Sequence, residues 1–278
     1  MYLGYHAYSL VDHYLPDAVE LLSDLGFGGI VLPLSSSRFH PKLFQDGAHA
    51  QIAAELDVAR SMRNAQFVID ATGPFLLSSV NATPLTLLDP DESSWEQGLG
   101  LLRWAFELAN QLGSGPVFVR TGPWDENRSS EEGLEKLHRR LEEVVPLAAR
   151  VDVTIGIRPA AGDFIATIAG FERLLQWYDS PHLAVVADTS TMFSQMELPL
   201  SSCLARVVDR LCAVILREPA LRGPAVDWID QGSVSPQAVV ECLQELDYAG
   251  GLFVDSLPSG PLAVETARII SQRMLPWI

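Results

Sequence analysis

The sequence predicts an α/β fold, and three observations indicate it. Short apolar runs rich in Val, Ile and Leu alternate along the chain with longer segments of helical spacing. Eight runs of the first kind and eight of the second can be counted. The 278 residues contain no linker-like or low-complexity stretch, so we expect one domain over residues 1–278. Eight alternating units predict a single (β/α)8 barrel, which typically needs about 250 residues. A doubly wound open sheet stays an alternative, because periodicity does not show closure.

The predicted strands are short and apolar. Runs such as Ala184-Val185-Val186-Ala187 are apolar at successive positions, which is typical of strands buried on both faces of a parallel sheet. We expect strands at residues 3–8, 29–34, 66–71, 117–120, 151–158, 182–188, 212–216 and 251–254.

The segments between the strands carry helix-start signals. Ser93 or Ser94, Ser129 or Ser130, and Ser235 each stand where a side-chain oxygen would cap a following helix. A long irregular segment, 76–91, precedes the third helix, and loops of this length are usually functional. We expect helices at residues 15–25, 49–62, 94–112, 131–149, 167–178, 200–210, 235–246 and 262–274.

The composition excludes some classes of partner. The net charge is −16, and a surface this acidic repels phosphate backbones, so no nucleic acid is expected as a partner. No apolar run reaches the length of a membrane span, and the N-terminus lacks the pattern of a signal peptide, so no membrane is expected either. The cysteines, Cys203, Cys212 and Cys242, form no Cys-x-x-Cys pair and suit buried thiols in a reducing compartment. We therefore expect a cytoplasmic protein.

Charged side chains stand at the carboxyl ends of the predicted strands. In a barrel these ends meet at one mouth, which is where barrel enzymes keep their reactive groups. Asp188 is the clearest example, because an apolar run has little reason to end in a carboxylate unless it faces a site; a helix cap or an ion pair with an arginine is the alternative. Trp124, in a loop, suits stacking on a sugar or packing a loop down. The strand-end candidates are His6, Asp70, Arg120, Arg158, Asp188, Arg217, Glu218 and Asp255.

Residues 151–193 carry a resemblance to a known family. One strand ends in Arg158-Pro159, a helix opens near Thr167, and a second strand ends in Asp188-Thr189-Ser190-Thr191. This stretch resembles the fifth and sixth units of the xylose isomerase-like barrels, the superfamily of sugar isomerases and epimerases, inosose dehydratase and endonuclease IV. Residues 230–235 resemble the Gly-x-Gly-x-Val-Asp turn of the same family. The resemblance spans nearly the whole chain and implies a closed barrel.

The resemblance also implies a divalent metal whose ligands this chain mostly lacks. The family has Glu-Asn at Arg158-Pro159, His at Thr191 and the His of His-x-Lys-Asp at Ile215. Arginine offers a metal no lone pair. We therefore expect no family-type metal and no other cofactor, and the trinuclear chemistry of the endonuclease relative is disfavoured.

Two carboxylates remain from the family pattern. Asp188 matches an Asp that binds the metal or lies beside it, and Asp255 stands where the family has a metal-binding Glu that can exchange a substrate proton. The resemblance thus implies a sugar or sugar-phosphate isomerase or epimerase in which Asp255 or Asp188 is the base and Arg158 stabilises the enolate. An inactive barrel that binds a ligand or partner is the alternative, and a homo-oligomer stays open.

Arginines at the mouth predict the charge of the ligand. A guanidinium fork matches a carboxylate or a phosphate, so we expect a small anionic carbohydrate. The residues expected to bind it are Arg120, Arg217, Glu218, His6, Asp70 and Trp124. In the competing interpretation, Arg158 pairs internally with aspartates and only fills the space that the metal left.

Overall fold

The strands close into a barrel. The computed structural model describes residues 1–10, 13–34, 66–72, 86–125, 127–218, 228–256 and 262–278. All neighbouring strands in it are parallel and follow chain order, and the last pairs with the first. This closure confirms the (β/α)8 barrel and excludes the open sheet. The strands are β1 (Tyr2–His6), β2 (Gly29–Pro33), β3 (Gln66–Asp70), β4 (Pro116–Val119), β5 (Thr154–Ile157), β6 (Leu183–Asp188), β7 (Leu211–Leu216) and β8 (Gly251–Val254).

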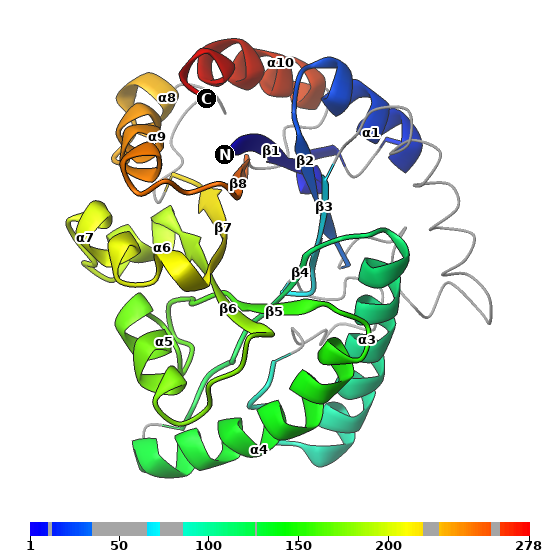
Figure 1. Ribbon diagram of the computed structural model, residues 1–278, viewed down its shortest axis with the longest axis vertical. Helices are drawn as coiled ribbons and strands as arrows, with labels where there is room; N and C mark the ends of the chain where they lie inside the picture. The colour runs from blue at the N-terminus through cyan, green and yellow to red at the C-terminus, as the bar shows by residue number, and fades with distance from the viewer. Residues whose placement is uncertain (11–12, 35–65, 73–85, 126, 219–227, 257–261) are drawn as a thin grey trace.

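Helices surround the ring of strands (Figure 1). Among the described residues, no helix is both long enough and apolar enough to cross a bilayer. The α-helices are α1 (Leu15–Asp24), α3 (Glu92–Gln111), α4 (Ser130–Ala149), α5 (Ile168–Leu175), α6 (Thr189–Ser194), α7 (Leu200–Ala205), α8 (Trp228–Gln231), α9 (Pro236–Glu245) and α10 (Ala263–Met274). Short 3-10 helices are η1 (Ala7–Leu10), η3 (Val208–Arg210) and η5 (Leu275–Trp277).

Side-chain caps begin several helices. Ser129 accepts from the Glu132 amide while Glu132 reaches back to the Ser129 amide, a complete capping box for α4. Ser235 caps α9 as expected. The expectation for α3 was wrong: Asp91, not Ser93 or Ser94, is the cap, because its carboxylate accepts from both the amide and the hydroxyl of Ser94.

Two other helices differ from expectation. Helix α6 follows β6 directly, because the Asp188 carboxylate caps it. The helix expected at 200–210 is divided into α7 and η3, since the chain leaves helical geometry at Val207, whose side chain enters the core. The helix expected at 49–62 lies outside the described residues, as does 76–85 of the long segment before α3.

The barrel interior is filled by side chains from alternate strand positions. The inward-facing core cluster consists of Val31, Val68, Phe118, Val186, Ala213, Ile215 and Phe253. The Phe253 ring lies so close to Gly4 that any Cβ at that position would overlap it, so β1 needs glycine there. Because side chains on one face of a strand recur every second residue, the next inward positions are those at the carboxyl ends of the strands.

Candidate functional site

Six ionisable side chains meet at the carboxyl ends of the strands. Each stands two residues after an inward-facing position, so the alternation of side chains along a strand directs it to the barrel mouth. Five of them follow Val68, Gly156, Val186, Ile215 and Phe253, and His6 follows Gly4. We call these six residues the mouth cluster: His6, Asp70, Arg158, Asp188, Arg217 and Asp255.

Arg158 is the centre of the mouth cluster. Its Nε and Nη2 donate to Oδ2 of Asp188 at 3.2 and 2.6 Å, and its Nη1 donates to Oδ2 of Asp70 at 3.3 Å. Asp255 Oδ2 lies 3.6 Å from Nη2. The Arg158 side chain is only 10% exposed. Burial opposes its charge, but the three carboxylates outweigh burial and raise the pKa of Arg158, so it is a permanent cation.

Both carboxylate oxygens of Asp188 accept hydrogen bonds. Its Oδ1 accepts from the Ser190 amide at 3.0 Å, the Ser190 hydroxyl at 2.7 Å and the Thr191 amide at 3.2 Å. Its Oδ2 accepts from Arg158. Burial works to raise the pKa of Asp188, but Arg158 and these hydrogen bonds lower it overall. Asp188 therefore both caps a helix and forms an ion pair, as the competing interpretation of the sequence expected.

Asp70 and His6 form a second buried pair. The His6 Nε2 and Asp70 Oδ2 atoms are 2.9 Å apart, and Thr72 donates its amide to Asp70 Oδ1 at 2.8 Å. The Tyr8 amide donates to His6 Nδ1 at 3.3 Å, so Nε2 is the nitrogen that carries the hydrogen to Asp70. Burial alone would raise the pKa of Asp70. The hydrogen bonds from His6 and Thr72 and the charge of Arg158 outweigh burial, so the pKa of Asp70 lies well below its ordinary value. Both residues lie in the cluster with their hydrogen-bonding groups occupied.

Asp255 is held more loosely. Its Oδ2 lies 3.6 Å from Arg158 Nη2 and 3.7 Å from Arg217 Nη1, both too long for a hydrogen bond. Within the described part of the chain, its carboxylate makes no shorter polar contact. The Asp255 side chain is 12% exposed and that of Arg217 is 37% exposed. Asp255 and Arg217 are therefore the members of the cluster with the most capacity for a ligand.

Three predicted ligand-binding residues make their polar contacts with partners outside the mouth cluster. Arg120 donates to both oxygens of Asp163, at 2.9 and 2.6 Å, in a bidentate pair. Glu218 accepts from the amides of Ser233 and Val234. These contacts join strand ends to neighbouring loops, and a ligand role for Arg120 or Glu218 stays a prediction.

Trp124 is the third of these residues. Its Nε1 donates to the Ser129 carbonyl at 3.1 Å, its ring meets Phe164 edge-on at 5.9 Å, and Arg128 lies 4.7 Å from the ring centre. These contacts match the loop-packing alternative, while sugar stacking by Trp124 stays a prediction.

Sequence reasoning gave no role to Thr189. Its hydroxyl donates to the Arg217 carbonyl at 2.9 Å and lies 3.0 Å from the Arg217 amide, which donates to it. This contact ties the end of β6 to the end of β7 and so places Arg217 beside the cluster. The sequence signal that could have pointed to this contact is the position of Thr189 directly after Asp188, in the motif that carries the family resemblance.

The donor set does not fit a divalent metal. A cation of this kind needs free carboxylate, imidazole or thiolate lone pairs. The Arg158 guanidinium stands at the end of β5 and offers only N–H groups, and it occupies the facing oxygens of Asp188 and Asp70. Among the described residues, no group of three or more His, Cys, Asp or Glu side chains could hold an ion. The expectation that no metal binds stays a prediction.

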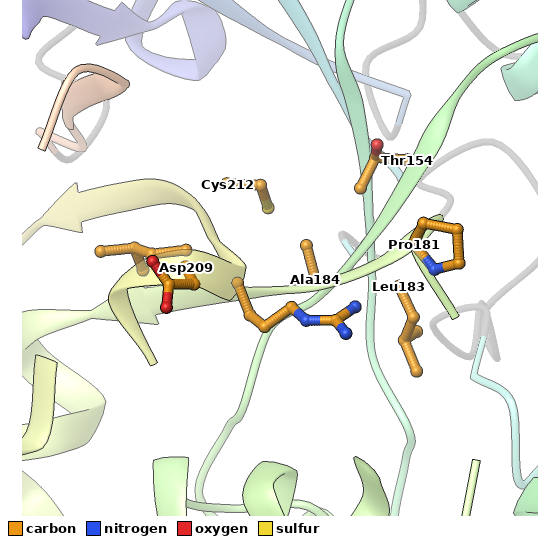
Figure 2. A pocket seen from close by; sticks show the side chains of 8 residues that line it. Thr154, Pro181, Leu183, Ala184, Asp209 and Cys212 are labelled. Atoms are coloured by element: carbon orange, nitrogen blue, oxygen red, sulfur yellow. The ribbon is translucent and has the colours of Figure 1, made fainter. Parts of the chain in front are cut away.

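A shallow hollow lies at the opposite ends of the strands. Figure 2 shows its lining, which includes Thr154, Leu183 and Leu211, the first residues of β5, β6 and β7. Its volume is about 400 Å³. Arg210 beside it is engaged, donating to the Ser180 carbonyl and to Asp179 at 2.7 Å each. The hollow is separate from the mouth cluster, since it lies at the other edge of the sheet.

Comparison with known proteins gives a family match. The family model for the xylose isomerase-like TIM barrel matches residues 19–272. No curated protein sequence matches the chain significantly.

Solved structures share the fold over the whole chain. The 3-keto-D-glucoside 4-epimerase from E. coli superimposes with a TM-score of 0.79 at 15% identity, covering 100% of both chains. The D-psicose 3-epimerase from Clostridium cellulolyticum H10, solved with D-tagatose, gives 0.76 at 14% identity, covering 100% of this chain and 99% of the other. The IOLI protein, solved with a bound zinc atom, gives 0.73 at 14% identity, with 97% of each chain covered. At these identities the likeness shows the fold alone.

Proposed function

Because the chain belongs to the xylose isomerase-like TIM barrel family, we propose that it is a sugar isomerase- or epimerase-like protein. It binds a small anionic carbohydrate at the mouth of the barrel and works without the divalent metal of its relatives. One observation carries this proposal. Among the described residues, Asp255 is the one cluster aspartate whose carboxylate accepts no hydrogen bond, and it lies between the guanidinium groups of Arg158 and Arg217.

Asp255 is the proposed base. Proton transfer next to a carbonyl needs a base within reach of the C–H group and a positive charge near the carbonyl oxygen. The Asp188 and Asp70 oxygens already accept short hydrogen bonds, so they are poor bases. Asp255 would take the proton, the C–H electron pair would form the C=C bond of the enolate, the C=O π pair would move to the oxygen, and the fixed charge of Arg158 would stabilise that oxygen. Return of the proton from Asp255 to the former carbonyl carbon, with transfer of the hydroxyl proton of the other carbon to the former carbonyl oxygen, completes an isomerisation.

Arg217 is the proposed anion-binding residue. Arg158 and Arg120 donate their hydrogen bonds to aspartates. The Arg217 side chain is 37% exposed, and its one polar side-chain contact among the described residues is the 3.7 Å contact with Asp255. The mouth cluster holds three carboxylates against two guanidinium groups, and a doubly charged phosphate would be repelled more than a carboxylate. These charges favour a sugar acid over a sugar phosphate.

A binding protein without turnover is the second candidate. It is favoured by the ion pairs of Arg158 with Asp188 and Asp70, which are what a guanidinium that only fills the mouth would form. The two functions make the same prediction for binding and opposite predictions for proton exchange.

Ligand-detected NMR in D2O tests both functions. Sugar acids, sugar phosphates and neutral sugars of matched length are screened for binding, and the C–H group next to the carbonyl is followed for exchange with deuterium. We expect a sugar acid to bind and to exchange, and Asp255→Asn to keep binding while it loses exchange. Binding without exchange would favour the binding protein. Absence of binding by every carbohydrate would contradict the proposal.

The anion role has its own matched variants. Arg217→Ala removes the exposed guanidinium, and Arg206→Ala removes one that is paired with Glu172 on the surface. A hydrogen bond to a charged group contributes about 1.5–3 kcal/mol, so affinity for the sugar acid should fall about 10- to 100-fold in Arg217→Ala. Affinity should stay unchanged in Arg206→Ala. Equal affinity of wild type and Arg217→Ala would refute the role of Arg217.

A further inference from the structure

Within the part of the chain that the structure describes, the Asp255 carboxylate accepts no hydrogen bond, so its position depends on the backbone that carries it. Asp188 and Asp70 accept hydrogen bonds between 2.6 and 3.3 Å, whereas the contacts of Asp255 with Arg158 and Arg217 are 3.6 and 3.7 Å long. The location of the carboxylate therefore depends on what fixes the chain on either side of it.

Two contacts fix the chain there. The Asp255 amide donates to the Leu216 carbonyl on β7 at 3.1 Å. On the other side, the Ser256 hydroxyl lies 2.6 Å from the Tyr5 hydroxyl, which belongs to β1. Tyr5 is fully buried and its ring packs against Phe27 at 5.1 Å between centres. Its hydroxyl is thus a rigid attachment point for the chain directly after Asp255.

The direction of this hydroxyl contact follows from a third residue. Ser9 donates its hydroxyl hydrogen to the Tyr5 oxygen at 3.0 Å. The single hydrogen of Tyr5 is then available for Ser256, and we assign Tyr5 as the donor in the 2.6 Å bond. Burial raises the pKa of Tyr5, which keeps its phenol protonated and able to donate. The result is an ordered chain of hydroxyls from η1 to the end of β8.

We propose that Tyr5 is a positioning residue for Asp255. Its hydroxyl holds Ser256 and thereby sets where the Asp255 carboxylate stands relative to Arg158 and Arg217. The inference rests on the proposed function, in which Asp255 is the base. Loss of the Tyr5 hydroxyl would leave the ring packed but release the chain next to Asp255.

The test compares two tyrosines that both bond to β8. Tyr5→Phe removes the hydroxyl at the carboxyl end of the strand, and Tyr248→Phe removes one that donates to the Gly251 carbonyl at the other end, at 3.2 Å. Misplacing a reacting group by about 1 Å lowers rates up to about 100-fold, so we expect Tyr5→Phe to lower kcat for proton exchange about 10- to 100-fold with KM nearly unchanged. Tyr248→Phe should keep the wild-type kcat.

A second pair of variants separates positioning from packing. Ser256→Ala removes the acceptor and should lower kcat as Tyr5→Phe does, and the double variant should be no worse than either single one. Ser9→Ala leaves the Tyr5–Ser256 bond in place and should have a smaller effect.

A readout without turnover keeps the inference testable by itself. In protein with 13C-labelled aspartate carboxyls, the Asp255 resonance is identified by its loss in Asp255→Asn. We expect it to shift in Tyr5→Phe and not in Tyr248→Phe. A wild-type kcat and an unshifted resonance in Tyr5→Phe would overturn the inference. If wild type exchanges no sugar proton, the proposed function fails and the resonance alone decides the role of Tyr5.

Discussion

Replacing Arg158 by Met tests what holds the mouth cluster together. Met keeps much of the side-chain stem but removes the charge and the hydrogen-bond donors. The variant leaves Asp70 and Asp188, whose side chains are 5% and 4% exposed, without their shared counter-ion. Removing one partner of a buried ion pair destabilises a protein by about 3–5 kcal/mol. The hydrogen bonds that Asp70 and Asp188 keep from other donors favour the lower end of this range for the free energy of unfolding.

The loss should depend on pH with a definite sign. In the wild type, the folded-state pKa values of Asp70 and Asp188 lie below the ordinary value of 3.8. Their ionised forms therefore stabilise the fold above pH 3.8, and this stability is lost as pH falls through the folded-state values. In Arg158→Met we expect burial, no longer opposed by the charge of Arg158, to raise both pKa values above 3.8, so that stability falls as pH rises through them. The difference between the two proteins should grow from about pH 4 to about pH 7.5.

Urea unfolding followed by tryptophan fluorescence measures this difference at both pH values. Arg140→Met is the matched control, because Arg140 is also buried but pairs with Glu92, which is exposed. We expect its loss to be smaller and nearly independent of pH. A loss for Arg158→Met below about 1 kcal/mol at pH 7.5, within the range of an exposed pair, would refute the reasoning. So would a loss that does not change with pH.

Three further predictions follow from single contacts. Burial raises the pKa of the Cys212 thiol to about 12, so iodoacetamide at pH 8 should modify Cys212 far more slowly in the native protein than after unfolding, as peptide mass spectrometry would show; equal rates would contradict this. Ser129→Ala removes the α4 cap and should lower the free energy of unfolding by about 0.5–2 kcal/mol, with Ser201→Ala on the surface of α7 as the unchanged control. Arg120→Ala should weaken ligand binding less than Arg217→Ala, because Asp163 already engages Arg120; a larger effect on affinity would place Arg120 at the ligand.

The fold was predictable because its signals are local. Apolar runs and capping residues lie within a few positions of the elements they specify, as at Ser129 and Ser235. The cap of α3 was missed because Asp91 and the serines after it offer the same chemistry, and only the backbone geometry selects among them. Closure of the barrel depends on the pairing of β1 with β8, which no local pattern encodes.

Strand-end reasoning named all members of the mouth cluster, but it also named Arg120 and Glu218, which lie outside it, and it did not predict the bonding. Alternation along each strand brings Asp70, Asp188 and Asp255 to one side, which strand-end reasoning captures. Alternation does not say which carboxylate oxygen accepts from Arg158. It therefore could not distinguish Asp188, whose oxygens accept hydrogen bonds, from Asp255, which lies 3.6 Å from Arg158. Partners in loops could not be predicted from the sequence either. Asp163, which accepts two hydrogen bonds from Arg120, lies 43 residues away along the chain.

We propose that the fixed charge of Arg158 takes the place of a divalent metal at the mouth, and elemental analysis is the test of this. The protein is purified without chelator and assayed for Mn, Zn, Co and Mg in proportion to protein. We expect none of them near one equivalent. A stoichiometric metal that is lost in Asp255→Asn would show that Asp255 and its neighbours anchor a metal site, and the proposed role of Arg158 would then be wrong.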